Sequence, residues 1–464
     1  MIKLLNIYGD NMIFQRGKPI RFCGYCSENS TICVEIFSGE KLLQQKKVNP
    51  KWNRWETELD TMEACRGLHV KISNGYESMV LSNVAIGDVW LCSGQSNIEC
   101  NFNYCSGTEE YIGKFGNCDI RFLDMEQDIS FFKNEELNNP KWISLNKENY
   151  MNLSVIGCVF GQYLAENINV PVGLIKNYRG GNSIVSFLSE ENLELCDRDG
   201  IFKEQLERER KEVKSAWSMI PTAFYNAMTA PIERFFVKGM LWYQGETDSA
   251  YERPIYYKEL LKKLIEQYRT DFGDLQLPVI LVQLCPFEME PFDFKVIREI
   301  QRKFADEDEN VYLIGTADMG PTGEIGEDPI HPKYKTPIGE RCAMAALANV
   351  YGKDIGEWSS PIIKSVCRKD EDLILQFAHC ADGLTADGKV HGFEVGCDRF
   401  FINGVKAEIL DKDKIIIKGI SNAKTIRYSY ANLTSEQNWG GNIKNSIGMP
   451  MIPFVWDCDI KGSV

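Results

Sequence analysis

The chain has only four histidines in 464 residues, and its 66 acidic residues outnumber 52 basic ones, which gives a formal net charge of −14. No apolar run approaches the ~18 residues that a membrane-spanning helix needs. A surface of this charge repels phosphate backbones, so we expect neither nucleic acid nor a membrane as a partner. The sequence also shows no internal repeat and no low-complexity linker. These absences leave an ordinary globular chain, with the oligomeric state open.

The N-terminus shows no secretion signal, because its first apolar run is short and Asp10 follows soon after. In such a chain the 16 cysteines are expected to be reduced core residues rather than a disulfide framework. Cys23 and Cys26 form a lone Cys-x-x-Cys, which is a weak indication of metal or redox chemistry. We therefore expect a cytoplasmic protein, while a secreted protein whose signal had been removed would look the same.

The pattern of apolar residues divides the chain into three parts. Residues 1–85 carry short strand-like runs separated by polar turns, which predicts an N-terminal β domain. Residues 86–352 alternate apolar strands with helical segments, which is typical of a parallel sheet covered on both faces. Residues 353–464 return to strand patterns and predict a C-terminal β domain. In the central part, strands are expected at 89–92, 170–175, 237–243, 279–284 and 311–316, and helices at 256–268 and 338–351.

An apolar strand runs directly into Gly94-Gln95-Ser96-Asn97. A serine on a tight turn after a strand exposes its hydroxyl as a nucleophile in several hydrolase folds. The backbone N–H groups that follow can then face a developing oxyanion. A Gly-Ser turn that simply opens a helix has the same pattern, so the motif alone leaves both interpretations open.

Asp328 lies three residues before His331 in the sequence. A carboxylate at this spacing can reach the Nδ1–H of the histidine on one loop, fix its tautomer and stabilise the imidazolium. The other three histidines, His69, His379 and His391, lie in strand-like or turn-rich stretches and are expected to be structural or at the surface.

Two more strands end in polar turns that fit such a site. One reaches a Gly180-Gly181 pair, where glycine lets a backbone N–H approach a ligand closely. The other ends at Gln244, whose side-chain amide could donate to an oxyanion. An ordinary exit from strand to loop explains each of them equally well.

Four motifs follow one another along the chain: Gly-Gln-Ser-Asn at 94–97, the glycine pair at 180–181, the Gln244 turn and the late Asp-x-x-His at 328–331. In this order they resemble the sialate O-acetylesterases of the SGNH hydrolase superfamily. The likeness extends to Pro-Thr-Ala-Phe-Tyr-Asn-Ala-Met at 221–228 and to Arg-Glu-x-Gln at 298–301, and so covers most of the chain. It implies a three-layer αβα hydrolase domain with a parallel sheet, flanked by N- and C-terminal β-sandwich-like regions. Many relatives carry an aromatic residue before the glycine pair where this chain has Arg179, which leaves the substrate open.

The resemblance implies a serine esterase that removes O-acetyl groups from sugars, with O-acetylated sialic acid as the first candidate. Ser96 would attack the acetyl carbonyl, His331 would take and return the proton, and Asp328 would orient His331. The N–H groups of Ser96 and Gly181, with the Gln244 amide, would hold the oxyanion. No metal and no organic cofactor is needed.

Further polar residues are expected to bind the substrate or to support the reacting groups. They are Gln95, Asn97, Arg179, Asn182, Glu246 and Arg298. The Arg179 guanidinium could pair with the carboxylate of a sialic acid, or it could make a structural ion pair with one of the many acids.

Three alternatives stay open. The substrate could be acetyl xylan or another acetylated carbohydrate. A glycosidase with two carboxylates is a weak alternative, because 66 acidic residues always supply a plausible pair. A non-catalytic carbohydrate-binding protein is disfavoured by the complete set of Ser96, Asp328 and His331.

Overall fold

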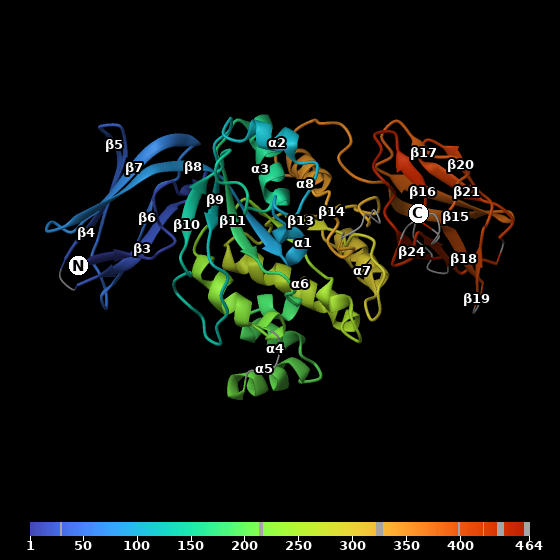
Figure 1. Cartoon of the computed structure of the whole chain (residues 1–464), viewed down its shortest axis with the longest axis horizontal. Helices are drawn as coiled ribbons and strands as arrows, with labels where there is room; N and C mark the ends of the chain where they lie inside the picture. The colour runs from blue at the N-terminus through green and yellow to red at the C-terminus, as the bar shows by residue number, and fades with distance from the viewer. Residues whose placement is uncertain are drawn as a thin grey trace. The chain divides into compact units, whose positions relative to one another are not determined.

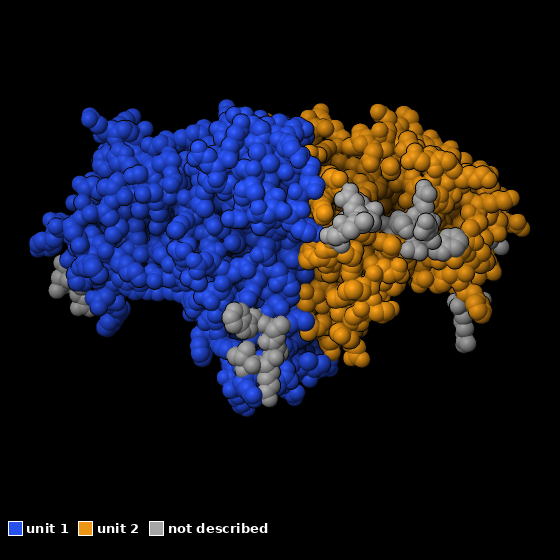
Figure 2. All heavy atoms as spheres, viewed as in Figure 1, with its two compact units in different colours: residues 1–244, 259–279 blue, residues 245–258, 280–464 orange. Residues whose placement is uncertain are grey.

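The computed structural model describes residues 1–27, 30–212, 217–321, 328–397, 400–420, 422–433 and 440–458. The chain forms two compact units (Figure 2). Unit 1 comprises residues 1–244 and 259–279, and unit 2 comprises residues 245–258 and 280–464. Within the described ranges, no helix is long and apolar enough to cross a membrane.

Unit 1 begins with short strands in the N-terminal part of the chain (Figure 1). They are β1 (Ile2–Leu4), β2 (Ile13–Gln15), β3 (Ile20–Cys26), β4 (Ile32–Ser38), β5 (Lys41–Val48), β6 (Arg54–Leu59) and β7 (Cys65–Ser73). β3 pairs antiparallel with β1 and β6, and β4 pairs antiparallel with β5 and β7. In β4 the alternate residues Ile32, Val34 and Ile36 are buried, as expected for a strand with one face on a core.

The long strand β8 (Ser78–Gly94) connects the N-terminal strands to the central sheet of unit 1. Its first half pairs antiparallel with β7, and its second half is buried at every residue from Val84 onward. Continuous burial is typical of a central strand in a parallel sheet. The predicted boundary between residues 85 and 86 therefore falls inside one continuous strand.

The central sheet of unit 1 has the strand order β10-β9-β11-β8-β12. Its other strands are β9 (Ile120–Asp124), β10 (Lys141–Ser144), β11 (Val172–Tyr178) and β12 (Gly239–Tyr243). β9, β11, β8 and β12 run parallel to their neighbours, and β10 is antiparallel at the edge. All five residues of β12 are buried, which fits a strand with both faces covered.

Helices follow most of these strands. Those of unit 1 are α1 (Ser96–Glu99), α2 (Glu109–Lys114), α3 (Val155–Ile168), α4 (Glu190–Cys196), α5 (Ile201–Lys211), the 3₁₀ turns η1 (Ile184–Phe187), η2 (Trp217–Met219) and η4 (Ala230–Ile232), and the π-helical turn η3 (Tyr225–Thr229). The helix α6 (Pro254–Asp271) spans the sequence boundary between the units. Ser154 caps α3 by accepting the Gly157 N–H at 3.0 Å, and its hydroxyl donates to the Ile98 carbonyl at 2.5 Å. This cap fixes α3 to α1 and so supports the end of β8.

Unit 2 contains the remaining strands and helices of the hydrolase region. They are η5 (Thr247–Ser249), β13 (Val279–Val282), α7 (Phe294–Glu307), β14 (Val311–Ile314) and α8 (Thr336–Asn349). β13 and β14 are neighbours in the sheet, and α7 and α8 both pack against β14. Apolar residues on one side of α7, among them Ile297 and Phe304, are buried, whereas the opposite side is polar.

The C-terminal part of unit 2 consists of strands. They are β15 (Ile362–Lys369), β16 (Asp372–Ala378), β17 (Leu384–Ala386), β18 (Phe393–Cys397), β19 (Phe400–Asn403), β20 (Ala407–Asp411), β21 (Lys414–Ile417), β22 (Thr425–Tyr428), β23 (Ile443–Asn445) and β24 (Phe454–Asp457). They form two four-stranded antiparallel sheets, β15-β16-β21-β20 and β19-β18-β22-β24, and the pair β17-β23. One apolar core holds residues of both sheets, such as Leu375 and Ile415 from the first and Val395 and Phe454 from the second.

Candidate active site

Ser96 is the first residue of α1 and follows the end of β8. Gly94 has a φ of +139°, and a Cβ at this position would lie 2.1 Å from the Tyr243 carbonyl oxygen. The Gln95 N–H donates to the same carbonyl at 3.0 Å. Only glycine permits this approach of two backbones. The close contact sets the turn that leaves Ser96 partly exposed while Gln95 is buried.

Three parallel strands of unit 1 end at the same level. Tyr178 at the end of β11 and Tyr243 at the end of β12 both pair in register with Gly94 at the end of β8. The residues that follow these strands therefore lie along one edge of the sheet. Ligands of parallel sheets bind at this edge, outside the carboxyl ends of the strands.

The glycine pair forms a β-turn beside the serine. The Asn182 N–H donates to the Arg179 carbonyl at 3.3 Å, and Gly181 has a φ of +73°, a conformation that favours glycine. Gly180 lies against Ser96, because a Cβ on it would be 3.6 Å from the Cβ of the serine. The structure thus places the predicted glycine turn next to the predicted nucleophile.

Gln244 is hydrogen-bonded to the turn before Ser96 and to the glycine turn. Its Nε2 donates to Gln95 Oε1 at 3.1 Å and to the Asn182 carbonyl at 3.0 Å. The backbone carbonyl can only accept, which identifies the nitrogen of the Gln244 amide. Both of its N–H groups are used in these bonds, so donation to an oxyanion would require that one of them be exchanged. The oxyanion role of Gln244 stays a prediction.

Asn97, the second residue of α1, and Asn182, the last residue of the glycine turn, are both buried. The side-chain nitrogen and oxygen of Asn182 have no hydrogen-bond partner among the residues that the structure describes. A buried polar group without a partner costs roughly 1–3 kcal/mol. Asn182 is therefore a second amide, besides that of Gln244, that could serve an oxygen atom entering this turn.

The predicted acid–histidine pair is present in unit 2. His331 Nδ1 lies 2.6 Å from Asp328 Oδ2, and the His331 N–H donates to the Asp328 carbonyl at 2.9 Å. The imidazole is about a quarter exposed. This is the contact that the spacing of the two residues predicts, whereas the role of His331 as the base stays a prediction.

Residues 86–347 match the carbohydrate esterase family of sialic acid-specific acetylesterases. This match spans more than half of the 464 residues. The chain belongs to this family. It is therefore a carbohydrate esterase.

Curated relatives agree with this assignment, and one solved structure shares the fold. The chain is 24% identical over 416 residues to the sialate O-acetylesterase of Mus musculus, across 77% of this chain and 75% of the mouse protein. It is 26% identical over 377 residues to the Homo sapiens protein of the same name, across 74% and 70% of the two chains. The structure of XAC1771, a carbohydrate acetylesterase from Xanthomonas citri, has a TM-score of 0.85 at 24% identity and covers 99% of this chain and 100% of its own. This likeness confirms the predicted α/β fold.

Sequence reasoning did not identify Glu99 and Gln127 as residues of the esterase site. Glu99 is the last residue of α1, and its Oε2 accepts the Gly180 N–H at 2.6 Å. Its Oε1 accepts from Gln127 Nε2 at 2.6 Å, and the same nitrogen donates to the Tyr178 carbonyl at 3.0 Å. The position of Glu99 three residues after Ser96 was the available signal, because residues at this spacing share one side of a helix.

Arg179 lies in an acidic environment. Burial lowers the pKa of the Arg179 guanidinium, and the nearby carboxylates of Glu99 and Asp128 counteract this shift. Whether Arg179 binds the carboxylate of a substrate or makes a structural ion pair stays a prediction.

Glu246 and Arg298 are buried in unit 2. Arg298 Nη2 donates to the carbonyls of Ala431 and Asn432, and burial lowers its pKa to about 10. These contacts attach the loop at 431–432 to α7. They favour a structural role for Arg298, whereas the predicted role of Glu246 stays a prediction.

His379 also has a carboxylate partner, Glu357, which lies 22 residues away in the sequence. His379 Nδ1 lies 2.8 Å from Glu357 Oε1. Burial raises the pKa of Glu357, but the backbone N–H of Ser359 and the His379 ring lower it by more. The same carboxylate accepts N–H groups of its own loop, so the pair stabilises a loop of unit 2, in keeping with the structural role predicted for His379.

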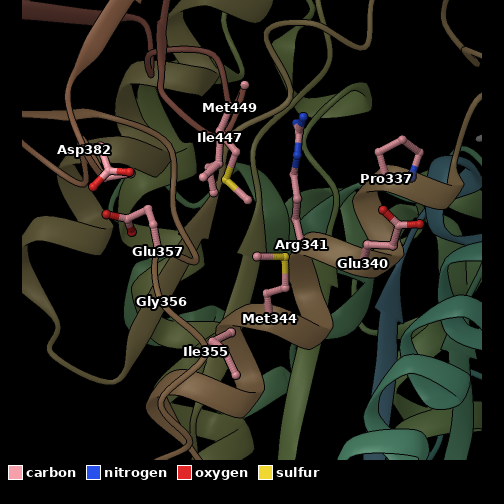
Figure 3. A pocket seen from close by; sticks show the side chains of 12 residues that line it. Pro337, Glu340, Arg341, Met344, Ile355, Gly356, Glu357, Asp382, Ile447 and Met449 are labelled. Atoms are coloured by element: carbon pink, nitrogen blue, oxygen red, sulfur yellow. The ribbon is translucent and has the colours of Figure 1, made fainter.

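A cavity of about 810 Å³ lies in unit 2 between α8 and the loops of the C-terminal strands. Figure 3 shows Glu357 and Asp382 on one side and Glu340 on the other, with Arg341 and Met344 between them. Its lining contains none of the site residues predicted from the sequence.

Proposed function

We propose that this carbohydrate esterase removes O-acetyl groups from sugars by a Ser-His-Asp mechanism, with O-acetylated sialic acid as the substrate. Ser96 Oγ attacks the acetyl carbonyl while His331 Nε2 takes the hydroxyl proton. The tetrahedral intermediate collapses, and the sugar oxygen leaves with the proton returned by His331. A water then attacks the acetyl-enzyme with His331 as base, and acetate leaves.

The observation that carries this proposal is the contact of Gly180 with Ser96 at the end of three parallel strands. A nucleophile on a tight turn beside a glycine turn is the arrangement that acyl transfer requires. The 2.6 Å contact of His331 with Asp328 supports the same chemistry from unit 2. The mechanism requires His331 Nε2 to come within about 3 Å of Ser96 Oγ during the reaction.

The oxyanion is held by the N–H groups of Ser96 and Gly181, and an amide supplies a third donor. Gln244 supplies it if one of its two bonds is exchanged, and Asn182 Nδ2 supplies it without such an exchange. Loss of one such donor typically lowers kcat by about 10²–10³-fold. Asn182→Ala and Gln244→Ala thus separate the two assignments by the size of the loss in kcat.

We propose the finer layering of the fold together with the function. The central domain is a three-layer αβα sandwich with a parallel sheet, and the regions on either side of it are β sandwiches. Packing of α3 on β9 and β11 in unit 1, and of α7 and α8 on β14 in unit 2, supports the layers. The common core of the two C-terminal sheets supports the second sandwich.

Release of acetate from O-acetylated sialic acid and from acetylated xylan tests the function. The proposal predicts faster release from sialic acid, and it predicts that Ser96→Ala removes activity on both. Faster release from xylan would make acetylated xylan the substrate and leave the proposed Ser-His-Asp mechanism unchanged. No release of acetate from any activated ester would favour a carbohydrate-binding protein without catalysis.

A further inference from the structure

Glu99 joins the nucleophile helix to the glycine turn. Its carboxylate is on the last residue of α1, the helix that begins at Ser96, and its Oε2 accepts the Gly180 N–H at 2.6 Å across 81 residues of sequence. A hydrogen bond from a backbone N–H to an ionised carboxylate is roughly twice as strong as a neutral one. The contact therefore fixes the turn relative to Ser96.

The second oxygen of Glu99 is held as well. Gln127 Nε2 donates to Glu99 Oε1 at 2.6 Å and to the Tyr178 carbonyl at 3.0 Å. Tyr178 is the last residue of β11, so the amide connects the carboxylate to the strand that leads into the turn. The side chain of Glu99 is thereby held at both oxygens and cannot rotate without breaking these contacts.

The turn needs such a support because it contains two adjacent glycines. Glycine has more accessible backbone conformations than any other residue, so an unsupported Gly180-Gly181 pair has a mobile peptide plane. An oxyanion donor must lie about 2.7–3.1 Å from the developing charge, and a misplacement of about 1 Å can cost roughly 10²-fold in rate. A fixed Gly180 N–H determines where the next N–H, that of Gly181, can point.

We infer that Glu99 is a positioning residue for the esterase reaction: by binding the Gly180 N–H it holds the Gly180-Gly181 turn so that the Gly181 N–H faces the carbonyl attacked by Ser96. This inference rests on the proposed function, in which Ser96 is the nucleophile. Glu99 does not contact the reacting atoms, and it exchanges no proton with them. Its effect appears in kcat because the oxyanion forms only in the transition state.

Two variants of Glu99 test the inference with 4-nitrophenyl acetate. Glu99→Ala is expected to lower kcat by roughly 100-fold with KM changed less than about threefold, because it releases the turn. Glu99→Gln keeps an oxygen that accepts the Gly180 N–H, but its amide nitrogen faces the nitrogen of Gln127. The kcat of Glu99→Gln is therefore expected to be roughly tenfold higher than that of Glu99→Ala.

The matched control is Glu110→Ala. Glu110 is an exposed acid on α2 of the same unit and pairs with Lys114 at 2.9 Å. It is expected to leave kcat and KM unchanged. A loss of kcat in Glu99→Ala no larger than in Glu110→Ala would overturn the inference. So would a Glu99→Gln variant whose pH–rate profile loses its acidic limb, because that result would make Glu99 a base.

Hydrogen exchange of the peptide that contains residues 179–182 gives a readout independent of activity. Glu99→Ala is expected to accelerate exchange there and not in β4, whereas a general loss of stability would accelerate both. Ser96→Ala separates this inference from the function on which it rests. Activity retained by Ser96→Ala refutes the nucleophile, and faster exchange in Glu99→Ala without loss of kcat refutes only the positioning role.

Discussion

Gly94→Ala perturbs the backbone contact that sets the nucleophile turn. The added Cβ would lie 2.1 Å from the Tyr243 carbonyl oxygen, whereas ordinary contacts begin at 3.4 Å. β8 and β12 would have to separate by about 1.3 Å to reach that distance. This movement breaks the 3.0 Å bond from the Gln95 N–H to the same carbonyl and displaces Ser96, which follows directly.

The cost of this substitution has two parts. The φ of +139° at Gly94 is strained for any residue with a Cβ, and such strain costs roughly 1–3 kcal/mol. The lost backbone hydrogen bond adds about 0.5–1.5 kcal/mol. We therefore expect Gly94→Ala to lower the free energy of unfolding by about 2–4 kcal/mol, and to lower kcat by roughly 10²-fold because the nucleophile is misplaced.

Urea unfolding and hydrolysis of 4-nitrophenyl acetate measure the two effects. Gly39→Ala is the control, because Gly39 has a φ of +56° in the turn between β4 and β5 and no atom within 4 Å of an added Cβ. It is expected to lose about 1–2 kcal/mol from backbone strain and to keep full activity. If Gly94→Ala were as stable and as active as Gly39→Ala, the backbone contact would not set the position of Ser96.

Three further predictions follow from the site and its surroundings. Asp328→Asn and His331→Ala should each depress kcat/KM strongly, and the double variant should be little worse than either; additive losses would show that the two residues do not act as a unit. Arg179→Ala should raise KM for O-acetylated sialic acid while sparing a neutral acetyl ester if the guanidinium binds the substrate, and equal losses on both would assign it the structural ion pair. Asp271→Asn should raise the free energy of unfolding by about 3 kcal/mol at pH 7 and by little near pH 3. Burial and Glu233 raise the pKa of Asp271 from 3.8 to about 6, so its charged form destabilises the fold increasingly as the pH rises from 3.8 through about 6. Equal gains at both pH values would contradict this reasoning.

The elements of the central region could be predicted from the sequence because their patterns are local. All five predicted strands are present, for example β12 (Gly239–Tyr243) within the predicted 237–243. Each predicted helix overlaps an observed one, and α6 (Pro254–Asp271) is longer than the expected 256–268. The contact of Asp328 with His331 was equally accessible, because the two residues are three positions apart on one loop.

The contacts that the sequence did not indicate join distant segments. Glu99 contacts Gly180 across 81 residues of sequence, and His379 contacts Glu357 across 22 residues. No local spacing in the sequence therefore predicts either pair. The two acceptors of Gln244 Nε2, Gln95 Oε1 and the Asn182 carbonyl, are also distant in the sequence and could not be foreseen from it. The boundary at residue 85 was placed where short strand patterns give way to strands that alternate with helical segments, and this point falls within one strand, β8.

The site of covalent attachment of a fluorophosphonate probe tests the central claim most directly. The probe reacts with an activated serine and imitates the tetrahedral intermediate in acyl transfer. Peptide mapping by mass spectrometry after complete inactivation is expected to find one adduct per chain, on Ser96. Inactivation with the adduct on another residue, or full activity after Ser96 has been modified, would contradict the account.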